Sequence, residues 1–158
     1  MTQERKQEFT RRITQANKTQ MITILYEMVL DYIEEARDAI SVGEKEKGTR
    51  CLSYAQSCID ELIRSVNLDF ELGRILLSIY IFSKKELTVA GVNYSLHRIW
   101  KVEQNFKMLY TAYHEIEKDD KSAPMMGNTQ TVYAGLTYGK YSLNEDVTAL
   151  SMNRGIMA

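Results

Sequence analysis

Hydrophobic residues recur along most of this chain with the period of an α-helix. The clearest case is residues 20–40, whose regular apolar stripe is Ile22, Leu25, Val29, Ile33, Ala36 and Ile40. At about 100° per residue, Met21, Ile24 and Met28 fall on a second apolar strip of the same helix. This helix therefore has more apolar surface than one core contact needs. We expect another segment of the chain, or a partner, to cover the second strip.

Three further long helices are predicted by the same periodicity, over residues 44–66, 70–90 and 99–118. The connections between them are short, which favours antiparallel packing of neighbouring helices. Residues 75–82, near the middle of one helix, are apolar nearly all the way round. The prediction is an all-α fold in which residues 17–120 form an antiparallel four-helix bundle.

Local residue types predict where these helices begin and end. Asn17 and Gln20 have the spacing of a capping box at the start of the first long helix. Gly43 suits its end, because glycine adopts the left-handed conformation at little cost. Asp69 is the predicted N-cap of the helix over residues 70–90, and Gly91 is predicted to lie in the turn that follows it.

The amino-terminal segment, residues 1–16, has room for one short helix over residues 4–16. Phe9 and Ile13 are its large apolar anchors, four residues apart on one face. Short helices are marginal in water on their own. We therefore expect this segment to pack against the rest of the chain, with Phe9 and Ile13 as candidates to cap an apolar groove.

The carboxyl-terminal segment, residues 121–158, differs in character from the helices. Residues 128–141 interleave tyrosine and β-branched residues with glycine and show no helical stripe. Tyr133 and Tyr138 can each bury an apolar ring while the hydroxyl stays in water, which suits docking into a groove. An extended segment that caps a groove and a flexible tail are both open interpretations.

Composition and charge narrow the classes of function. The chain has 158 residues, 44% of them hydrophobic, enough for one globular domain without a metal or disulfides. Its formal net charge of −1 gives no general attraction to nucleic acid. The sequence has neither an apolar run of about eighteen residues nor the apolar core of a signal peptide. We expect a cytoplasmic protein that neither inserts into membranes nor binds nucleic acid.

Motifs of catalysis and metal binding are missing from the sequence. Di-metal helical bundles use Glu-x-x-His pairs, but Tyr94 stands three residues before His97 and Thr111 three before His114. Phosphate-binding loops and the G-x-S-x-G nucleophile motif do not occur. We predict that the protein is not an enzyme and uses no metal or cofactor.

The remaining functional signal is apolar surface beyond the core stripes. The candidate groove residues are Met21, Ile24, Leu25, Met28, Leu77, Ile81 and Trp100. Apolar grooves of this kind can receive helical segments of a partner, and methionines adapt to irregular shapes. Two interpretations stay open. Either the terminal segments cover this surface as ordinary core, or a partner binds it.

Residues 22–40 of the first long helix read ITILYEMVLDYIEEARDAI. This sequence resembles the opening helix of the flagellar export chaperone family, FliS. The family pattern is approximately L-x-x-x-L-Y-(D/N)-x-x-L-x-(F/Y)-I-x-x-A-x-x-A-I. The matching residues are Leu25, Tyr26, Leu30, Tyr32, Ile33, Ala36, Ala39 and Ile40. Further matches follow in order at Ala55, Ile59, Glu61 and Leu62, at 67–70, and at 79–82. The resemblance covers about residues 16–118.

This resemblance implies a cytoplasmic chaperone that holds the disordered carboxyl-terminal segment of flagellin in apolar grooves. Such binding would prevent premature polymerisation and present the subunit for export. An export-gate component is a further partner that the resemblance implies, and the protein itself would be a monomer or a weak homodimer. The alternative is a self-associating structural or adaptor helical bundle without a flagellin client.

Overall fold

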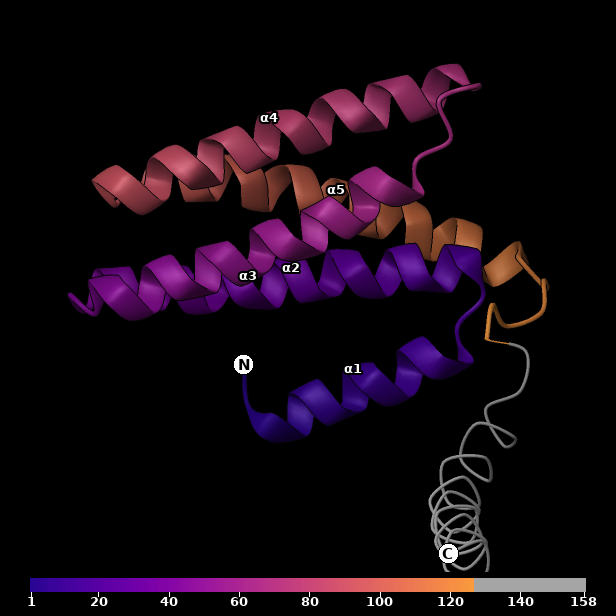
Figure 1. The fold of residues 1–158 in the computed structure, drawn as a ribbon, viewed down its shortest axis with the longest axis horizontal. Helices are drawn as coiled ribbons and strands as arrows, with labels where there is room; N and C mark the ends of the chain where they lie inside the picture. The colour runs from indigo at the N-terminus through magenta and orange to yellow at the C-terminus, as the bar shows by residue number, and fades with distance from the viewer. Residues whose placement is uncertain (127–158) are drawn as a thin grey trace, which may run out of the picture.

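The computed structural model describes residues 1–126, which form five α-helices and, within that range, no strand. The helices are α1 (Gln3–Gln15), α2 (Lys18–Ser41), α3 (Lys45–Ser65), α4 (Glu71–Asn93) and α5 (Leu96–Asp119). Each helix runs back along the one before it (Figure 1). The prediction of an all-α fold is confirmed for this part of the chain.

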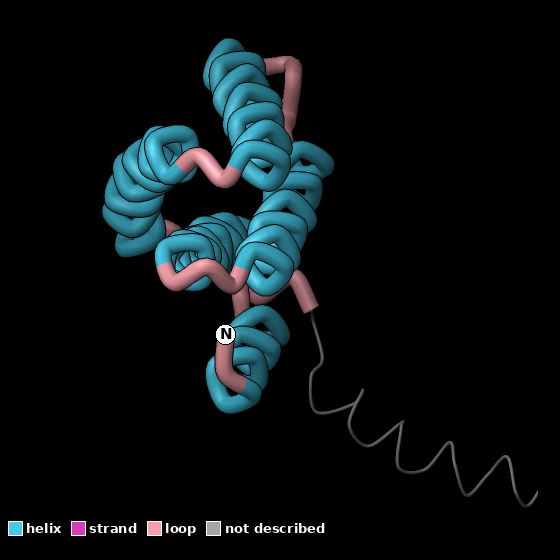
Figure 2. The backbone as a smooth tube through the Cα atoms, turned by 90° about the vertical axis from the view of Figure 1, so that its left-hand side faces the viewer, coloured by secondary structure: helices cyan, strands magenta, loops and turns pink. Residues whose placement is uncertain are grey.

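The four long helices surround one core, and α1 lies outside them. α2 packs against α3 and α5, and α4 packs against the same two helices. α1 packs chiefly against α2, below the other helices in Figure 2. Within the described residues, no helix is both long and apolar enough to span a bilayer.

An aromatic cluster fills the centre of the core. Tyr26, Tyr80 and Phe106 are almost completely buried, and the ring centroids of Tyr26 and Phe106 are 5.7 Å apart. The hydroxyl groups of Tyr26 and Tyr80 share a hydrogen bond of 2.5 Å. Burial raises the pKa of Tyr80 to about 12, so both hydroxyls stay neutral and satisfy each other.

Both predicted signals at the ends of α2 are confirmed. The Asn17 side chain accepts a hydrogen bond of 2.8 Å from the backbone N–H of Gln20, and the Gln20 side chain accepts one of 2.9 Å from the N–H of Asn17. Gly43, just after α2, has a φ of 86°, in the left-handed region that glycine tolerates. Local sequence therefore decides both ends of this helix.

Two predicted ends of α4 are wrong. The N-cap is Phe70 rather than Asp69, whose backbone N–H instead donates to the Asn67 side chain in a turn. α4 also continues past Gly91 and ends at Asn93, before a left-handed Tyr94. Gly91 still lies beside α3 at this point, so the packing of α4 on α3 extends the helix through the glycine.

Candidate functional site

α1 covers the second apolar strip of α2. Phe9, Ala16 and Ile24 form a small buried cluster of their own, and Ile24 is only 4% exposed. The partly buried side chains around this cluster are Met1, Ile13, Met21 and Met28. The predicted strip of Met21, Ile24 and Met28 therefore exists, and Phe9 and Ile13 lie on it.

Paired charges flank this apolar contact. Arg5 donates hydrogen bonds of 2.6 Å to Glu27 and 2.9 Å to Asp31, and Arg12 pairs with Glu27 at 2.8 Å. The guanidinium groups of Arg5 and Arg12 also lie over the Phe9 ring, 4.5 Å and 5.6 Å from its centroid. Burial alone would raise the pKa of Glu27, but the hydrogen bonds and charges of the two arginines outweigh it and lower that pKa.

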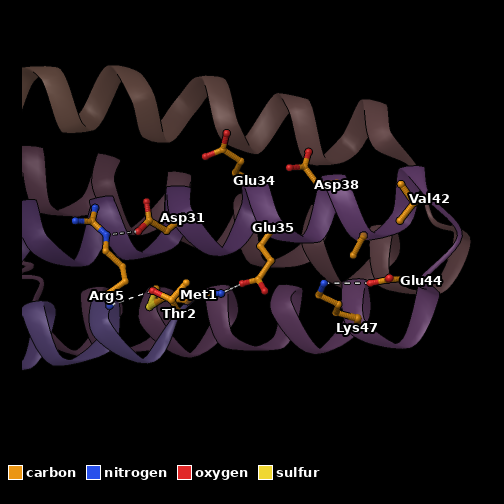
Figure 3. A pocket seen from close by; sticks show the side chains of 11 residues that line it. Met1, Thr2, Arg5, Asp31, Glu34, Glu35, Asp38, Val42, Glu44 and Lys47 are labelled. Carbon is orange, nitrogen blue, oxygen red and sulfur yellow. Dashed lines mark hydrogen bonds and ion pairs between the residues drawn. The ribbon is translucent and has the colours of Figure 1, made fainter.

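A charged cavity of about 590 Å³ lies where the start of α1 meets α2 and α3 (Figure 3). The amino group of Met1 pairs with Glu35, Arg5 reaches Asp31, and Lys47 pairs with Glu44. Glu34 and Asp38 also line the cavity, so its wall has more acidic than basic groups beside these ion pairs. The ion pairs tie the amino terminus to α2 and present no nucleophile with a neighbouring base.

The predicted groove residues do not share one surface. Leu25 belongs to the main core, because it lies on the stripe of α2 that faces the other long helices, and its assignment to a groove is wrong. Leu77 is half-buried, whereas Ile81 and Trp100 are 55% and 52% exposed on α4 and α5. α4, which carries Leu77 and Ile81, packs on α3 and α5, whereas α1 packs on α2.

Several exposed apolar residues at the start of α4 were not predicted as site residues. Phe70 and Leu72 are 66% and 58% exposed, and Ile75 and Phe82 are exposed further along the helix. The all-round apolar character of residues 75–82 was the available signal for part of this surface. The predicted groove residues Tyr133 and Tyr138 lie outside the described residues.

The described residues do not favour metal chemistry. Among residues 1–126, no group of three or more His, Cys, Asp or Glu side chains could hold a metal ion. His97 stacks on Trp100, and His114 stacks on Tyr110, with both imidazoles at the surface. The main features of residues 1–126 outside the core are the apolar contact beneath α1, with ion pairs beside it, and the exposed apolar side chains of α4 and α5.

The family model described as flagellar protein FliS matches residues 1–120, a range that contains all five helices. The chain belongs to the FliS family. The family predicted from the Leu25-Tyr26 pattern is thereby confirmed, and it is a family of flagellar export chaperones. A search of curated proteins found no match.

The residues that identify the FliS family in this chain are mainly residues of the core. Tyr26, Ile33 and Ala36 are fully buried, and Leu25 is nearly so. The family pattern on α2 therefore describes mainly how this helix packs.

Proposed function

We propose that this protein is a cytoplasmic export chaperone that binds the carboxyl-terminal segment of flagellin, prevents its premature polymerisation and assists its export. The scaffold is the antiparallel four-helix bundle of α2–α5. The main observation in support is the apolar strip of α2, which is covered by a separate short helix rather than by the bundle itself. Membership of the FliS family supports the same proposal.

α1 is a cover that a client can replace. Its large anchor is Phe9, and burial of one such side chain contributes about 2–3 kcal/mol. The ion pairs of Arg5 and Arg12 are partly exposed, so each adds less than about 1 kcal/mol. A client helix with apolar residues four apart, in the manner of Phe9 and Ile13, can compete for the same strip.

The exposed side chains of α4 and α5 give the client a second contact. A disordered segment loses conformational entropy when it folds on binding, so it needs a large apolar surface in return. Ile81 on α4, with Leu77 four residues before it, and Trp100 on α5 supply apolar surface beyond the α1 strip. A client that wraps from one surface to the other would use both.

The test is a titration with a peptide from the carboxyl terminus of flagellin, followed by calorimetry and gel filtration. Phe9→Ala should increase the affinity by about thirtyfold or more, because it raises the fraction of molecules with an uncovered strip. Ile24→Asp should weaken binding, because it places a charge on the strip itself. Gln7→Ala, on the exposed side of α1, is the matched control and should change nothing.

Failure of the peptide to bind the wild-type chain, the Phe9→Ala variant and a chain ended after Met126 would contradict the proposal. Loss of the helical signal in Ile24→Asp would show instead that Ile24 supports the fold. Circular dichroism of each variant therefore accompanies the titration.

Self-association is a second candidate function, favoured by the exposed Ile75, Ile81 and Phe82 on α4. A dimer that buried these side chains would be a structural or adaptor bundle without a free client surface. Equilibrium sedimentation distinguishes the two, because a client-binding chaperone should remain a monomer or a weak dimer at micromolar concentration.

A further inference from the structure

A small apolar pocket lies at the end of the bundle where α2 and α4 begin and α3 ends. It has a volume of about 220 Å³. Its apolar walls are Ile22, Val66, Phe70, Leu72 and Leu76, with Tyr80 and Tyr113 at the sides. Lys18, Ser65 and Asn67 contribute polar atoms to its lining. An engineered cavity of about 150 Å³ holds a benzene ring, so this pocket has room for one aromatic side chain.

The chain after α5 is held close to this pocket. The backbone N–H of Met125 donates to the carbonyl oxygen of Ala16 at 2.9 Å. The side-chain amide of Asn17 donates to the carbonyl oxygens of Asp120 and Ser122, at 3.2 and 3.4 Å. Residues 120–125 are therefore fixed at the junction of α1 and α2, just before the Lys18 that lines the pocket.

We propose that this pocket takes the side chain of Tyr133, from the carboxyl-terminal segment of the same chain. The proposal concerns a site other than the strip beneath α1, and it does not depend on the identity of the client.

Distance favours this occupant. Tyr133 is seven residues beyond Met126, and seven extended residues reach about 25 Å. Lys18 and Ile22, which both line the pocket, follow Ala16 by two and six residues, and they lie about 6 Å apart along α2. Tyr133 is also the first aromatic residue after Met126, and the cost of closing a loop rises with its length.

The chemistry of the pocket also fits tyrosine. A phenol ring can pack against Phe70, Leu72 and Ile22 while its hydroxyl remains beside the polar atoms of the pocket lining. Phe70 and Leu72 are among the exposed large hydrophobic residues of the chain, and the ring of Tyr133 would cover part of both. A tethered side chain acts at an effective concentration of about millimolar, so a contact with a dissociation constant below about millimolar is mostly occupied.

Disulfide trapping tests the proposal without removing the tyrosine. In the variant Leu72→Cys with Ala134→Cys, a docked Tyr133 brings the two thiols together in a glutathione buffer. The matched control is Ile81→Cys with Ala134→Cys, because Ile81 is about equally exposed on the same helix but nine residues further along. The native Cys51 and Cys58 are buried, and burial raises the pKa of both thiols, so they compete little.

We expect the intramolecular disulfide to form at least tenfold faster with Leu72→Cys than with Ile81→Cys. Adding Tyr133→Ser should remove that advantage, whereas adding Tyr138→Ser should leave it intact. Equal rates for the two pairs, or an advantage that survives Tyr133→Ser, would overturn the proposal. A predominantly intermolecular disulfide would also overturn it, because a second copy would then occupy the pocket.

Hydrogen exchange of the single variant Tyr133→Ser gives an independent readout. Within the described residues, no side-chain hydrogen bond caps the start of α4. A docked ring should therefore slow exchange in residues 71–76, and Tyr133→Ser should speed it about threefold or more. Unchanged exchange in this segment would count against docking.

Discussion

The starts of α2 and α4 both carry apolar side chains that do not pack into the core of the four long helices. In the described residues, one of these two sets is covered and the other is exposed. On α2, the strip around Ile24 is buried beneath α1. On α4, Phe70, Leu72 and Ile75 remain exposed. The two surfaces have similar chemistry. What separates them is a cover with an apolar anchor and arginines that match the acidic residues beside the strip.

α2 and α4 also differ in what holds their first turns in place. α2 begins at a reciprocal capping box, so its first turn is held by its own residues. α4 begins without a side-chain cap, and the loop before it passes directly over Gly73. The start of α4 therefore depends on packing, whereas the start of α2 depends on local hydrogen bonds.

Gly73→Ala should have the largest effect, because it attacks the packing that holds the start of α4. A Cβ atom at this position would lie 1.8 Å from the carbonyl oxygen of Asn67, and a backbone atom cannot move aside without shifting the loop. We expect a loss of about 3 kcal/mol in the free energy of unfolding, measured with urea. Gly91→Ala is the control on the same helix. Its nearest contacts are 3.8 Å away, so it should stabilise the chain by about 0.5 kcal/mol.

Phe9→Ala should break the cover of α2 and leave the bundle intact. The loss of the buried ring should weaken the docking of α1 by about 2–3 kcal/mol, a change of about thirtyfold or more in the opening equilibrium. Hydrogen exchange should therefore speed up in α1 while α3 remains protected. Equal loosening of α1 and α3 would mean that α1 belongs to the cooperative core.

Acid should loosen the cover before it affects the start of α4. The folded state lowers the pKa of Glu27, so its contribution is fully present above the unfolded-state pKa of about 4.5 and is lost as the pH falls through the folded value. The protection of α1 against exchange, relative to the intrinsic rate at each pH, should thus fall below about pH 4.5. Glu27→Gln should flatten this dependence in part, because Glu8 and Asp31 also pair with Arg5.

The control for this pH dependence is Glu115→Gln. The pKa of Glu115 is also lowered, by its hydrogen bond to Lys118, but both residues are exposed on α5. If Glu115→Gln changed the acid response of α1 as much as Glu27→Gln, the ion pairs of α1 would not be its cause.

Ile75→Ser should have the smallest effect on stability. Ile75 is 51% exposed, so its replacement should change the free energy of unfolding by no more than about 0.5 kcal/mol. Ile24→Ser, the matching change on the covered strip, should cost several times more, because Ile24 is buried under Phe9. Comparable urea midpoints for the two variants would contradict the contrast between the surfaces.

The sequence predicts those parts of the fold that depend on neighbouring residues. The capping box at Asn17 and Gln20 and the glycine at position 43 were readable because their effects are local. Gly91 misled the prediction because its effect depends on α3, more than thirty residues away in sequence. Packing between helices overrides a local propensity of this size.

The candidate site likewise has a part that the sequence predicts and a part that it does not. Helical periodicity alone identifies the strip of Met21, Ile24 and Met28 on α2. It wrongly placed Leu25 in the groove, because the helical period is the same on both apolar faces of α2 and does not show which neighbour each face meets. The pairing of Arg12 with Glu27 could not be inferred, since it depends on the turn that folds α1 back onto α2.

That turn consists of Ala16 and Asn17 alone, between the end of α1 and the start of α2. Even when α1 leaves the strip, so short a tether keeps it nearby at an effective concentration of about millimolar or above. Any molecule bound to the strip therefore competes continuously with α1, which cannot diffuse away because it belongs to the same chain. The two-residue turn thus favours release of a bound molecule from the strip. It sets a minimum affinity that such a molecule must exceed to stay bound.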